Sequence, residues 1–265
     1  RYLDILIRPR NLRKEIGDIY DIEPIDEHTF LLATNKGLLC YDWKNRNINK
    51  THPFNKVAHD LTQKQVADIF YDKQKKDVWI GMKKNGGLIQ KNLVTGKTVH
   101  FKTGDDQFPL VHNGVLVIYP EEETLWVGTE GGLQKINTKT LESQVYTFSS
   151  NLQNRIVGIL AEKEYLWIST YKGLVRMNKS TGEYTIHDCQ NMANGSSEFN
   201  RKSFLKVNDS TLFFGTTKGM LKINPKKKST EEIRNTIVLV EANYFSKEKE
   251  RKITKTLDLK TTNTF

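Results

Sequence analysis

Few residues in this 265-residue sequence have a spacing that suggests catalytic or metal-binding chemistry. Its six histidines never fall two on one strand face or in a His-Glu-x-x-His run; they are His28, His52, His59, His100, His112 and His187. A metal site needs three or four ligands that converge on one point. The sequence therefore predicts no metal site, and the absence of a nucleotide-binding glycine motif predicts no cofactor.

Clustered carboxylates are the other candidates for chemistry. Glu121, Glu122 and Glu123 are consecutive, and "GDD" occupies 104–106. The three glutamates stand between two apolar segments where a polar turn is needed, and neighbouring side chains of a turn diverge instead of forming an acid–base pair. A convergent group of Tyr, His and carboxylate, as a polysaccharide lyase would need, is also missing. We expect solvated turns and a fragment without enzymatic activity.

The elements that position these residues are repeated. A strand, a glycine turn and a second strand recur five times, as "FLLATNKGLLCYD" (30–42), "VWIGMKKNGGLIQKN" (78–92), "LWVGTEGGLQKIN" (125–137), "LWISTYKGLVRMN" (166–178) and "LFFGTTKGMLKIN" (212–224). The glycines before the second strand lie at 37, 87, 132, 173 and 219, which gives spacings of 50, 45, 41 and 46 residues (87−37, 132−87, 173−132, 219−173). This period is typical of a four-stranded propeller blade. We predict an all-β fold, a β-propeller of five blade repeats that forms part of a larger ring.

One column of large apolar residues runs through the repeats. Trp79, Trp126 and Trp167 align with Phe213 in the fifth copy and with Leu31 in the first. A platform for stacking sugars is the functional alternative, but a ring that recurs in phase on a middle strand favours packing between neighbouring blades. All five are expected to be buried.

The repeat pattern also suggests domain boundaries. Residues 1–15 are interpreted as a strand or linker from an upstream region, and 16–230 as the propeller. After "INPKKKS" the segments "NTIVLVEANYFSKE" and "KITKTLDL" alternate without the repeat phrase, so 235–265 are predicted to begin a β-sandwich. The sequence has no run of about eighteen apolar residues that could span a membrane. Cys40 and Cys189 lie in different repeats and are not expected to form a disulfide.

The net charge of +10 is distributed unevenly over the expected loops. In an antiparallel blade the segment leading into the first strand and the turn between the second and third strands emerge on one face. We name this the basic face, because these segments carry Arg13, Lys14, Lys36, Lys64, Lys83, Lys84, Arg155, Lys172, Arg201, Lys202 and Lys218 against Glu15, Glu130 and Glu198. The turns between the first and second strands, on the opposite face, carry more acidic than basic residues; they hold Asp26, Glu27, Asp72, Asp77, Glu121, Glu122, Glu123, Glu162, Glu164 and Asp209 beside Lys73, Lys75, Lys76 and Lys163.

The basic face suggests a binding site for an acidic or sulfated oligosaccharide. Arg155 and Arg201 open or directly precede innermost strands, and arginine forks match carboxylate or sulfate oxygens. Each follows an asparagine, Asn154 or Asn200, which can hydrogen-bond sugar hydroxyls. The turn of the second repeat is two residues longer than those of the third to fifth repeats. Its residues should therefore project above the rim of the basic face, and they are the last candidates for the site: Lys83, Lys84 and Asn85. The alternative is that these residues only keep the protein soluble.

These phrases resemble a known repeat family. "LWVGTEGGLQKIN" is similar to the two-component-regulator propeller repeat, and "SSEFNRKSFLKVNDSTLFFGTTKGMLKINP" (196–225) resembles the last such repeat in hybrid two-component sensors of gut Bacteroidetes. "NTIVLVEANYFSKE" resembles the start of the Ig-like Tyr-Tyr-Tyr domain that follows there. The sequence departs from the consensus at Leu31, Ala33 and Met82.

The resemblance implies a periplasmic sensor region that detects glycan fragments and works as a homodimer. In the family, membrane helices absent from this sequence connect that region to a histidine kinase. A non-catalytic protein-interaction scaffold remains the alternative, since propellers serve that role equally well. Nucleic-acid binding is not expected, because the sequence lacks the interleaved aromatic and basic residues of a stacking surface.

Overall fold

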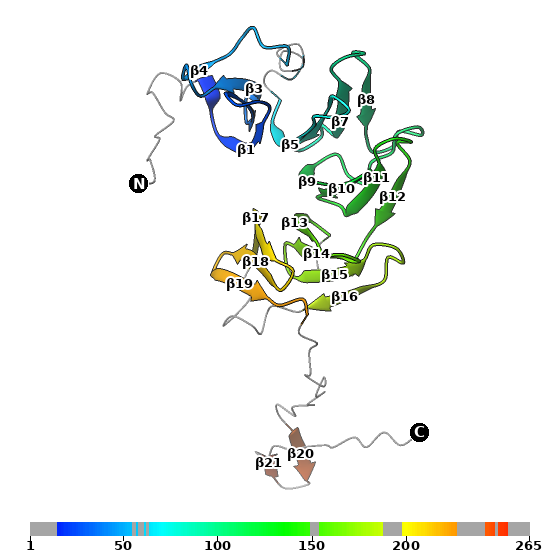
Figure 1. Ribbon diagram of the computed structural model, residues 1–265. Coiled ribbons are helices and arrows are strands. Elements are labelled where there is room, and N and C mark those ends of the chain that lie inside the picture. The colour runs from blue at the N-terminus through cyan, green and yellow to red at the C-terminus, as the bar shows by residue number, and fades with distance from the viewer. Residues whose placement is uncertain are drawn as a thin grey trace. The chain divides into compact units, whose positions relative to one another are not determined.

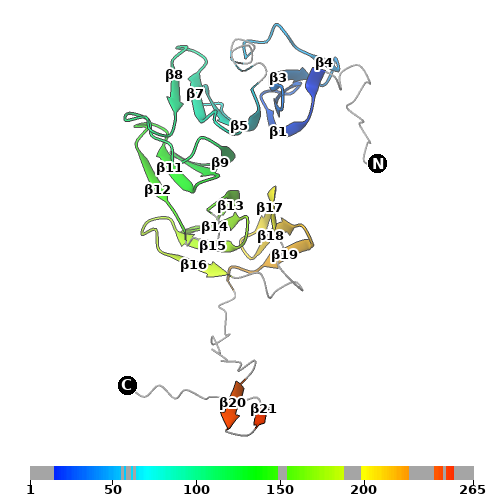
Figure 2. The same ribbon diagram turned by 180° about the vertical axis from the view of Figure 1, so that it is seen from behind.

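The computed structural model describes residues 15–54, 57, 61, 64–148, 154–187 and 198–226, together with two strands at 242–246 and 249–253. The chain divides into two units, 1–224 and 225–265. In the first unit the sheets follow one another in sequence order about a common axis (Figures 1 and 2). The described residues of that unit form five antiparallel sheets, which confirms the all-β propeller arrangement.

Each sheet is one blade whose strands run outward from the axis in sequence order. The strands of the first two blades are β1 (Ile19–Pro24), β2 (Thr29–Thr34), β3 (Gly37–Asp42), β4 (Asn47–Ile48), β5 (Val66–Asp72), β6 (Asp77–Met82), β7 (Leu88–Asn92) and β8 (Thr98–Phe101). Those of the third and fourth are β9 (Val115–Glu121), β10 (Thr124–Thr129), β11 (Leu133–Asn137), β12 (Ser143–Tyr146), β13 (Ile156–Ala161), β14 (Tyr165–Thr170), β15 (Leu174–Asn178) and β16 (Tyr184–His187). The fifth blade contains β17 (Phe199–Asn208), β18 (Thr211–Thr216) and β19 (Gly219–Ile223).

A threonine and a glycine close the turn between the second and third strands. Thr129 Oγ1 donates to the Gly132 carbonyl oxygen at 2.8 Å, and the same bond recurs in the first, fourth and fifth blades. Gly132 has a φ of 155°, which lies in the region that favours glycine. Met82 replaces the threonine in the second blade, where the longer turn closes with a backbone bond of 2.9 Å from Met82 N to Gly87 O.

The aromatic column fills the interfaces between blades. Trp79 and Trp126 are each 1% exposed, Trp167 is 5% exposed and Leu31 is fully buried. Each packs against the next blade in sequence; Trp126, for example, contacts the cluster of apolar residues that β13, β14 and β15 provide. These four predictions are confirmed.

The prediction that Phe213 is buried is wrong. Phe213 occupies the column position of the last blade, and its side chain is only half-buried. The column residues pack on the blade that follows, and the fifth blade is the last one in the described part of the first unit. The aromatic ring therefore lacks the neighbour that covers its equivalents.

The second unit contains a hairpin of β20 (Ala242–Ser246) and β21 (Lys249–Ile253), which pair antiparallel. Residues 242–245 thus pair with β21 and not with the last blade. Residues 1–14, 227–241 and 254–265 lie outside the described part of the chain. The predicted boundaries at 15 and 235, and the predicted sandwich, stay predictions.

Candidate ligand-binding pocket

A pocket of about 280 Å³ opens between the fourth and fifth blades. Its lining combines arginine, tyrosine, carboxylate, amide and hydroxyl groups with a few apolar side chains; the residues are Leu116, Arg155, Val157, Tyr171, Glu198, Phe199, Asn200, Arg201 and Thr217. The volume lies near the lower end of small-molecule sites, about 300–1,000 Å³. Three of the residues that the sequence predicted, Arg155, Asn200 and Arg201, therefore meet in one pocket.

Backbone hydrogen bonds explain why these segments meet. Tyr171 N in the β14–β15 turn donates to the Arg155 carbonyl oxygen at 3.0 Å, and Thr217 N in the β18–β19 turn donates to that of Glu198 at 2.9 Å. The same contact recurs in the third blade, from Glu130 N to Gly114 O at 2.9 Å. The turn between the second and third strands is thus tied to the segment that leads into the first strand.

Arg155 is the accessible cation of the pocket. Its side chain is 45% exposed, and its guanidinium lies 3.5 Å from a carboxylate oxygen of Glu130 and 5.5 Å from the centre of the Tyr171 ring. Exposed ion pairs of this kind contribute only about 0–1 kcal/mol, so an incoming anion can compete with Glu130 for the guanidinium.

Tyr171 and Glu198 are two further polar groups of the pocket lining. The Tyr171 hydroxyl hydrogen-bonds Glu198, and this bond raises the pKa of Tyr171 above its ordinary value. The tyrosine therefore remains a neutral donor throughout the physiological range. Its ring, the Glu198 carboxylate and the exposed Asn200 side chain together offer both an apolar surface and hydrogen-bonding groups to a ligand.

Arg201 lines the same pocket, but its guanidinium points into the axis of the ring. Nε donates to the Leu116 carbonyl oxygen at 2.9 Å, and a terminal nitrogen donates to the Ala67 carbonyl oxygen. Ala67 and Leu116 are the extra residues of β-bulges at the starts of β5 and β9. Bulged residues leave the strand ladder. Arg201 thus ties the fifth blade to the second and third.

The neighbouring residue, Lys202, joins the fifth blade to the first and second. Its Nζ lies 2.5 Å from Asp21 Oδ1 and 2.7 Å from Asp68 Oδ1. Asp68 is 1% exposed and accepts a hydrogen bond of 2.6 Å from Ile118 N on the third blade. Lys202 has a φ of 54° inside an irregular stretch of β17, and this strained backbone directs the side chain to the axis.

Burial, the charge of Lys202 and the hydrogen bond between Asp21 and Asp68 determine the pKa values of the two aspartates. Burial raises the pKa of Asp68 to about 8, with Lys202 acting in the opposite direction. Burial also acts to raise the pKa of Asp21, but the hydrogen bond with Asp68 and the charge of Lys202 hold it below its ordinary value. Sequence reasoning missed this cluster. Its signal was an Asp-Ile pair at the same position of two innermost strands, in "YDIEP" and "ADIFY".

The other predicted site residues lie elsewhere. Asn154 closes a loop, since its side chain accepts from Phe148 N at 2.6 Å and donates to Phe148 O at 3.0 Å. Lys83 packs over the Tyr20 ring at 3.6 Å, while Lys84 and Asn85 are exposed in the long turn. They are not in the lining of the pocket.

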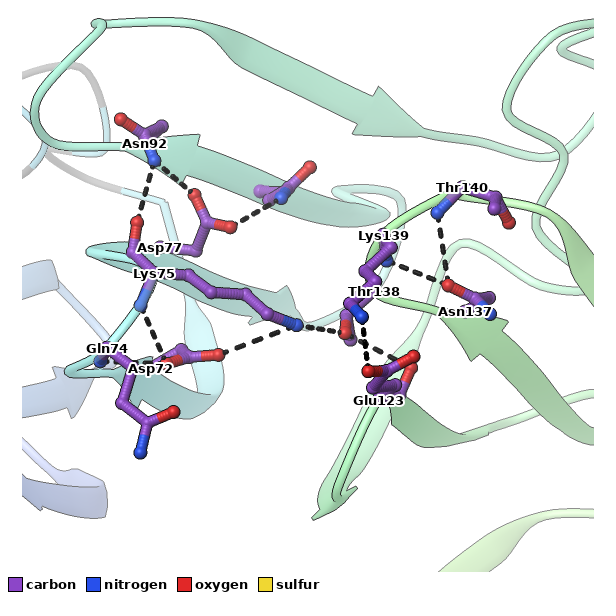
Figure 3. A network of polar contacts seen from close by, with 11 residues as sticks. Asp72, Gln74, Lys75, Asp77, Asn92, Glu123, Asn137, Thr138, Lys139 and Thr140 are labelled. Atoms are coloured by element: carbon purple, nitrogen blue, oxygen red, sulfur yellow. Dashed lines mark hydrogen bonds and ion pairs between the residues drawn. The ribbon is translucent and has the colours of Figure 1, made fainter.

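The acidic turns on the opposite face form bridges between and within blades. Lys75 Nζ donates to Thr138 Oγ1 at 2.6 Å and thereby joins the second and third blades, and Lys139 pairs with Glu123 (Figure 3). Glu121 pairs with Lys179 of the fourth blade. Glu122 and Glu123 lie in an exposed turn, as predicted, and Glu121 and Glu123 are in addition ion-paired. Among the residues that the structure describes, no group of three His, Cys, Asp or Glu side chains could hold a metal ion.

A cysteine, a histidine and an aspartate lie in line near the first blade. Cys40 Sγ is 4.0 Å from His52 Nδ1, and His52 Nε2 is 3.8 Å from Asp26 Oδ2. The order resembles that of a nucleophilic triad. Cys40 is fully buried, however, and burial raises the pKa of its thiol to about 12. A thiol in that state is a poor nucleophile at neutral pH.

Neither a protein-family model nor a curated protein sequence matches the chain. Solved structures do. The extracellular domain of the hybrid two-component system BT3049 from B. thetaiotaomicron is 20% identical, with a TM-score of 0.58 over 79% of this chain and 28% of that one. The extracellular domain of the hybrid two-component system BT4673 from the same organism is 21% identical, with a TM-score of 0.60 over 78% of this chain and 27% of that one.

The same fold is also found in proteins of other kinds. YCF48 from Cyanidioschyzon merolae is 8% identical, with a TM-score of 0.53 over 80% of this chain and 71% of that one. At such identities the likeness shows the fold alone. The chain spans about a quarter of the length of the two-component structures that it matches. None of the described residues belongs to a helix with the length and hydropathy of a membrane span.

Proposed function

We propose that this chain is an extracytoplasmic, non-catalytic sensing propeller of a hybrid two-component system, and that the pocket between its fourth and fifth blades binds an oligosaccharide. The likeness to extracellular domains of such systems supports the sensing role. The observation that carries the ligand proposal is the pocket lining, where Arg155, Tyr171 and Glu198 converge. From the resemblance of the repeats to those of hybrid two-component sensors, we further propose that the full-length protein is a homodimeric periplasmic sensor histidine kinase.

The chemistry of the lining favours a sugar ligand. A tyrosine ring covers an apolar face of a pyranose, while amide, hydroxyl and carboxylate groups hydrogen-bond its hydroxyls. Asn200 and Thr217 supply the neutral polar groups and Glu198 an acceptor. Binding of this kind needs no reacting group, in keeping with a sensor.

An acidic or sulfated sugar suits Arg155 best. Its guanidinium is only loosely held by Glu130 at 3.5 Å, so a ligand carboxylate or sulfate can replace that partner with a two-point contact. Attraction between exposed charges is screened within about 8 Å at physiological salt. Affinity is therefore expected to fall as the salt concentration rises.

A calorimetric titration tests the ligand proposal. Trigalacturonic acid and a chondroitin sulfate disaccharide serve as acidic probes, and maltotriose serves as the neutral probe. We expect saturable binding of an acidic probe to the wild type and at least tenfold weaker binding to Arg155→Ala. Lys97→Ala removes the same charge from an exposed turn on the opposite face and should bind like the wild type.

Three results would contradict the proposal. They are equal binding by wild type and Arg155→Ala, a preference for maltotriose, and no binding of any probe by the protein. Lys84→Ala decides whether the long turn of the second blade also takes part.

A further inference from the structure

The pocket between the fourth and fifth blades contains two opposite charges at the same place in the repeat. Arg155 directly precedes β13 and Glu198 directly precedes β17, and both side chains line the pocket. Arg155 forms its ion pair with Glu130, at 3.5 Å, and no ion pair between the described residues joins it to Glu198. A guanidinium fork and a carboxylate match each other well. Because these two are not paired with each other, a ligand can contact both.

Tyr171 contacts both charged groups without joining them. The centre of its ring lies 5.5 Å from the Arg155 guanidinium carbon, and its hydroxyl hydrogen-bonds Glu198. The backbone fixes the two segments: Tyr171 N donates to the Arg155 carbonyl oxygen at 3.0 Å, and Thr217 N donates to that of Glu198 at 2.9 Å. Glu198 N in turn donates to Thr217 Oγ1 at 3.3 Å. The positions of both charges therefore follow from the turns of the two blades.

The Glu198 carboxylate can accept more hydrogen bonds than Tyr171 supplies. A carboxylate has two oxygens with about four acceptor sites, and the Tyr171 hydroxyl is a single donor. The bond between Glu198 and Thr217 described above involves the backbone nitrogen and leaves the carboxylate unchanged. A ligand can therefore donate to Glu198, and a positively charged donor makes the stronger bond.

An acid group alone does not complement this lining. Once bound to Arg155, it shares a pocket of about 280 Å³ with the Glu198 carboxylate. Two like charges repel each other, and salt screens them little over distances shorter than about 8 Å. A ligand hydroxyl can donate to Glu198, but it leaves that negative charge in place. An ammonium group on the ligand donates and also cancels the charge.

We infer that the pocket binds one sugar unit with both an acid group and a free amino group, the acid group at Arg155 and the ammonium at Glu198. This inference rests on the proposed function and narrows its ligand from acidic sugars to zwitterionic ones. The pocket volume lies at the lower end of the range for small-molecule sites, which favours a single unit of a longer chain.

Two sugars that differ in one group test the inference on the full chain. Glucosamine 6-sulfate carries an amino group where glucose 6-sulfate carries a hydroxyl, and at about pH 6 that amino group is protonated. In calorimetric titrations we expect the wild type to bind glucosamine 6-sulfate at least about fivefold more tightly. Glu198→Gln keeps an acceptor oxygen for Tyr171 but removes the charge, so the two sulfates should then bind equally. The four affinities form a double-mutant cycle.

Glu130→Gln is the matched control, since it removes a carboxylate that contacts Arg155 and is not in the pocket lining. Without this competitor both sulfates should bind more tightly, and the ratio of their affinities should stay as in the wild type. A ratio that falls to one in Glu130→Gln but persists in Glu198→Gln would overturn the inference, because the ammonium would then contact Glu130.

The remaining results separate this inference from the proposed function. Equal binding of the two sulfates by the wild type, with both weakened in Arg155→Ala, would overturn the inference and leave the proposed function standing. No binding of either sulfate at millimolar concentration would overturn both. If Glu198→Gln has a lowered Tm, the wild type decides with N-acetylglucosamine 6-sulfate, which has no ammonium. It should bind no more tightly than glucose 6-sulfate, and binding as tight as that of glucosamine 6-sulfate would overturn the inference.

Discussion

Two arginines line the same pocket, but their guanidinium groups are held in different ways. Arg201 donates to the backbone of the second and third blades inside the ring, and Lys202 beside it binds two aspartates. Arg155 stands at the rim, 45% exposed, with a loose ion pair to Glu130 at 3.5 Å and the Tyr171 ring at 5.5 Å. The side chains inside the ring therefore fix the blades relative to one another, while the cation at the rim remains exposed, as our proposal of a ligand there requires.

The largest effect is expected inside the blade interfaces. Replacing Trp126 with alanine should lower the free energy of unfolding by about 3–5 kcal/mol, because a buried aromatic leaves a cavity. Phe213→Ala, at the same position of the last blade, should cost only about 1–2 kcal/mol, since its ring is half-buried. Urea unfolding of both variants measures the difference. Equal losses would show that the last blade is packed like the others.

Removing the axial arginine should come next. Arg201→Ala leaves the bulge carbonyls of Ala67 and Leu116 without their donor and is expected to cost about 2–4 kcal/mol. Arg201→Lys keeps the charge but cannot reach both carbonyls in the same fork geometry, so it should recover only part of that loss. Thermal unfolding of the two variants checks this order. A loss below about 0.5 kcal/mol, as for ordinary surface substitutions, would show that Arg201 contributes no more to stability than an exposed residue at the rim.

The axial aspartates should make stability depend on pH. The pKa of Asp68 is raised by burial to about 8 in the folded state, above its value in the unfolded chain, so the folded state binds more protons between about pH 4 and 8. Its contribution is fully present below pH 4 and is lost as the pH rises through 8, at up to about 1.4 kcal/mol per pH unit. Asp68→Asn should flatten this part of the curve. A Tm profile from pH 4 to 8 that is identical in both proteins would contradict the assignment.

The smallest effect on stability should be at the rim. Arg155→Ala breaks an exposed pair with Glu130 and is expected to change the free energy of unfolding by less than about 0.5 kcal/mol. Urea unfolding beside the wild type measures it. A loss as large as that of Arg201→Ala would remove the distinction between interior and rim.

The sequence predicted the repeated blades, but it did not predict the contacts that join blades across the axis of the ring. The recurring phrase indicated the blades and the buried tryptophans, because local strand and turn patterns determine them. The same pattern gave the wrong expectation for Phe213, since burial depends on a neighbouring blade that no local pattern reveals. Arg201 was assigned to a ligand for a similar reason. Its partners, Ala67 and Leu116, are backbone groups 134 and 85 residues away and are exposed by bulges.

The structure brings predicted residues together where turn geometry alone determines their positions, and whether they bind a ligand stays a prediction. Arg155 and Asn200 share a pocket because segments that lead into first strands adjoin the turns between second and third strands in every blade described. The Asn154 side chain instead hydrogen-bonds the backbone of Phe148. Its place beside Arg155 in the sequence did not predict this contact. The lysines of the long second-blade turn are on the expected face, but the pocket forms two blades further along the ring.

The most direct test of the account measures affinity and stability on the same protein. Arg155→Ala is titrated with trigalacturonic acid and the chondroitin sulfate disaccharide, and its Tm is recorded beside that of the wild type. We predict an unchanged Tm together with at least tenfold weaker binding of the probe that the wild type binds. An unchanged affinity, or a fall in Tm like that of Arg201→Ala, would contradict the claim that the rim arginine serves a ligand while the axial arginine holds the ring.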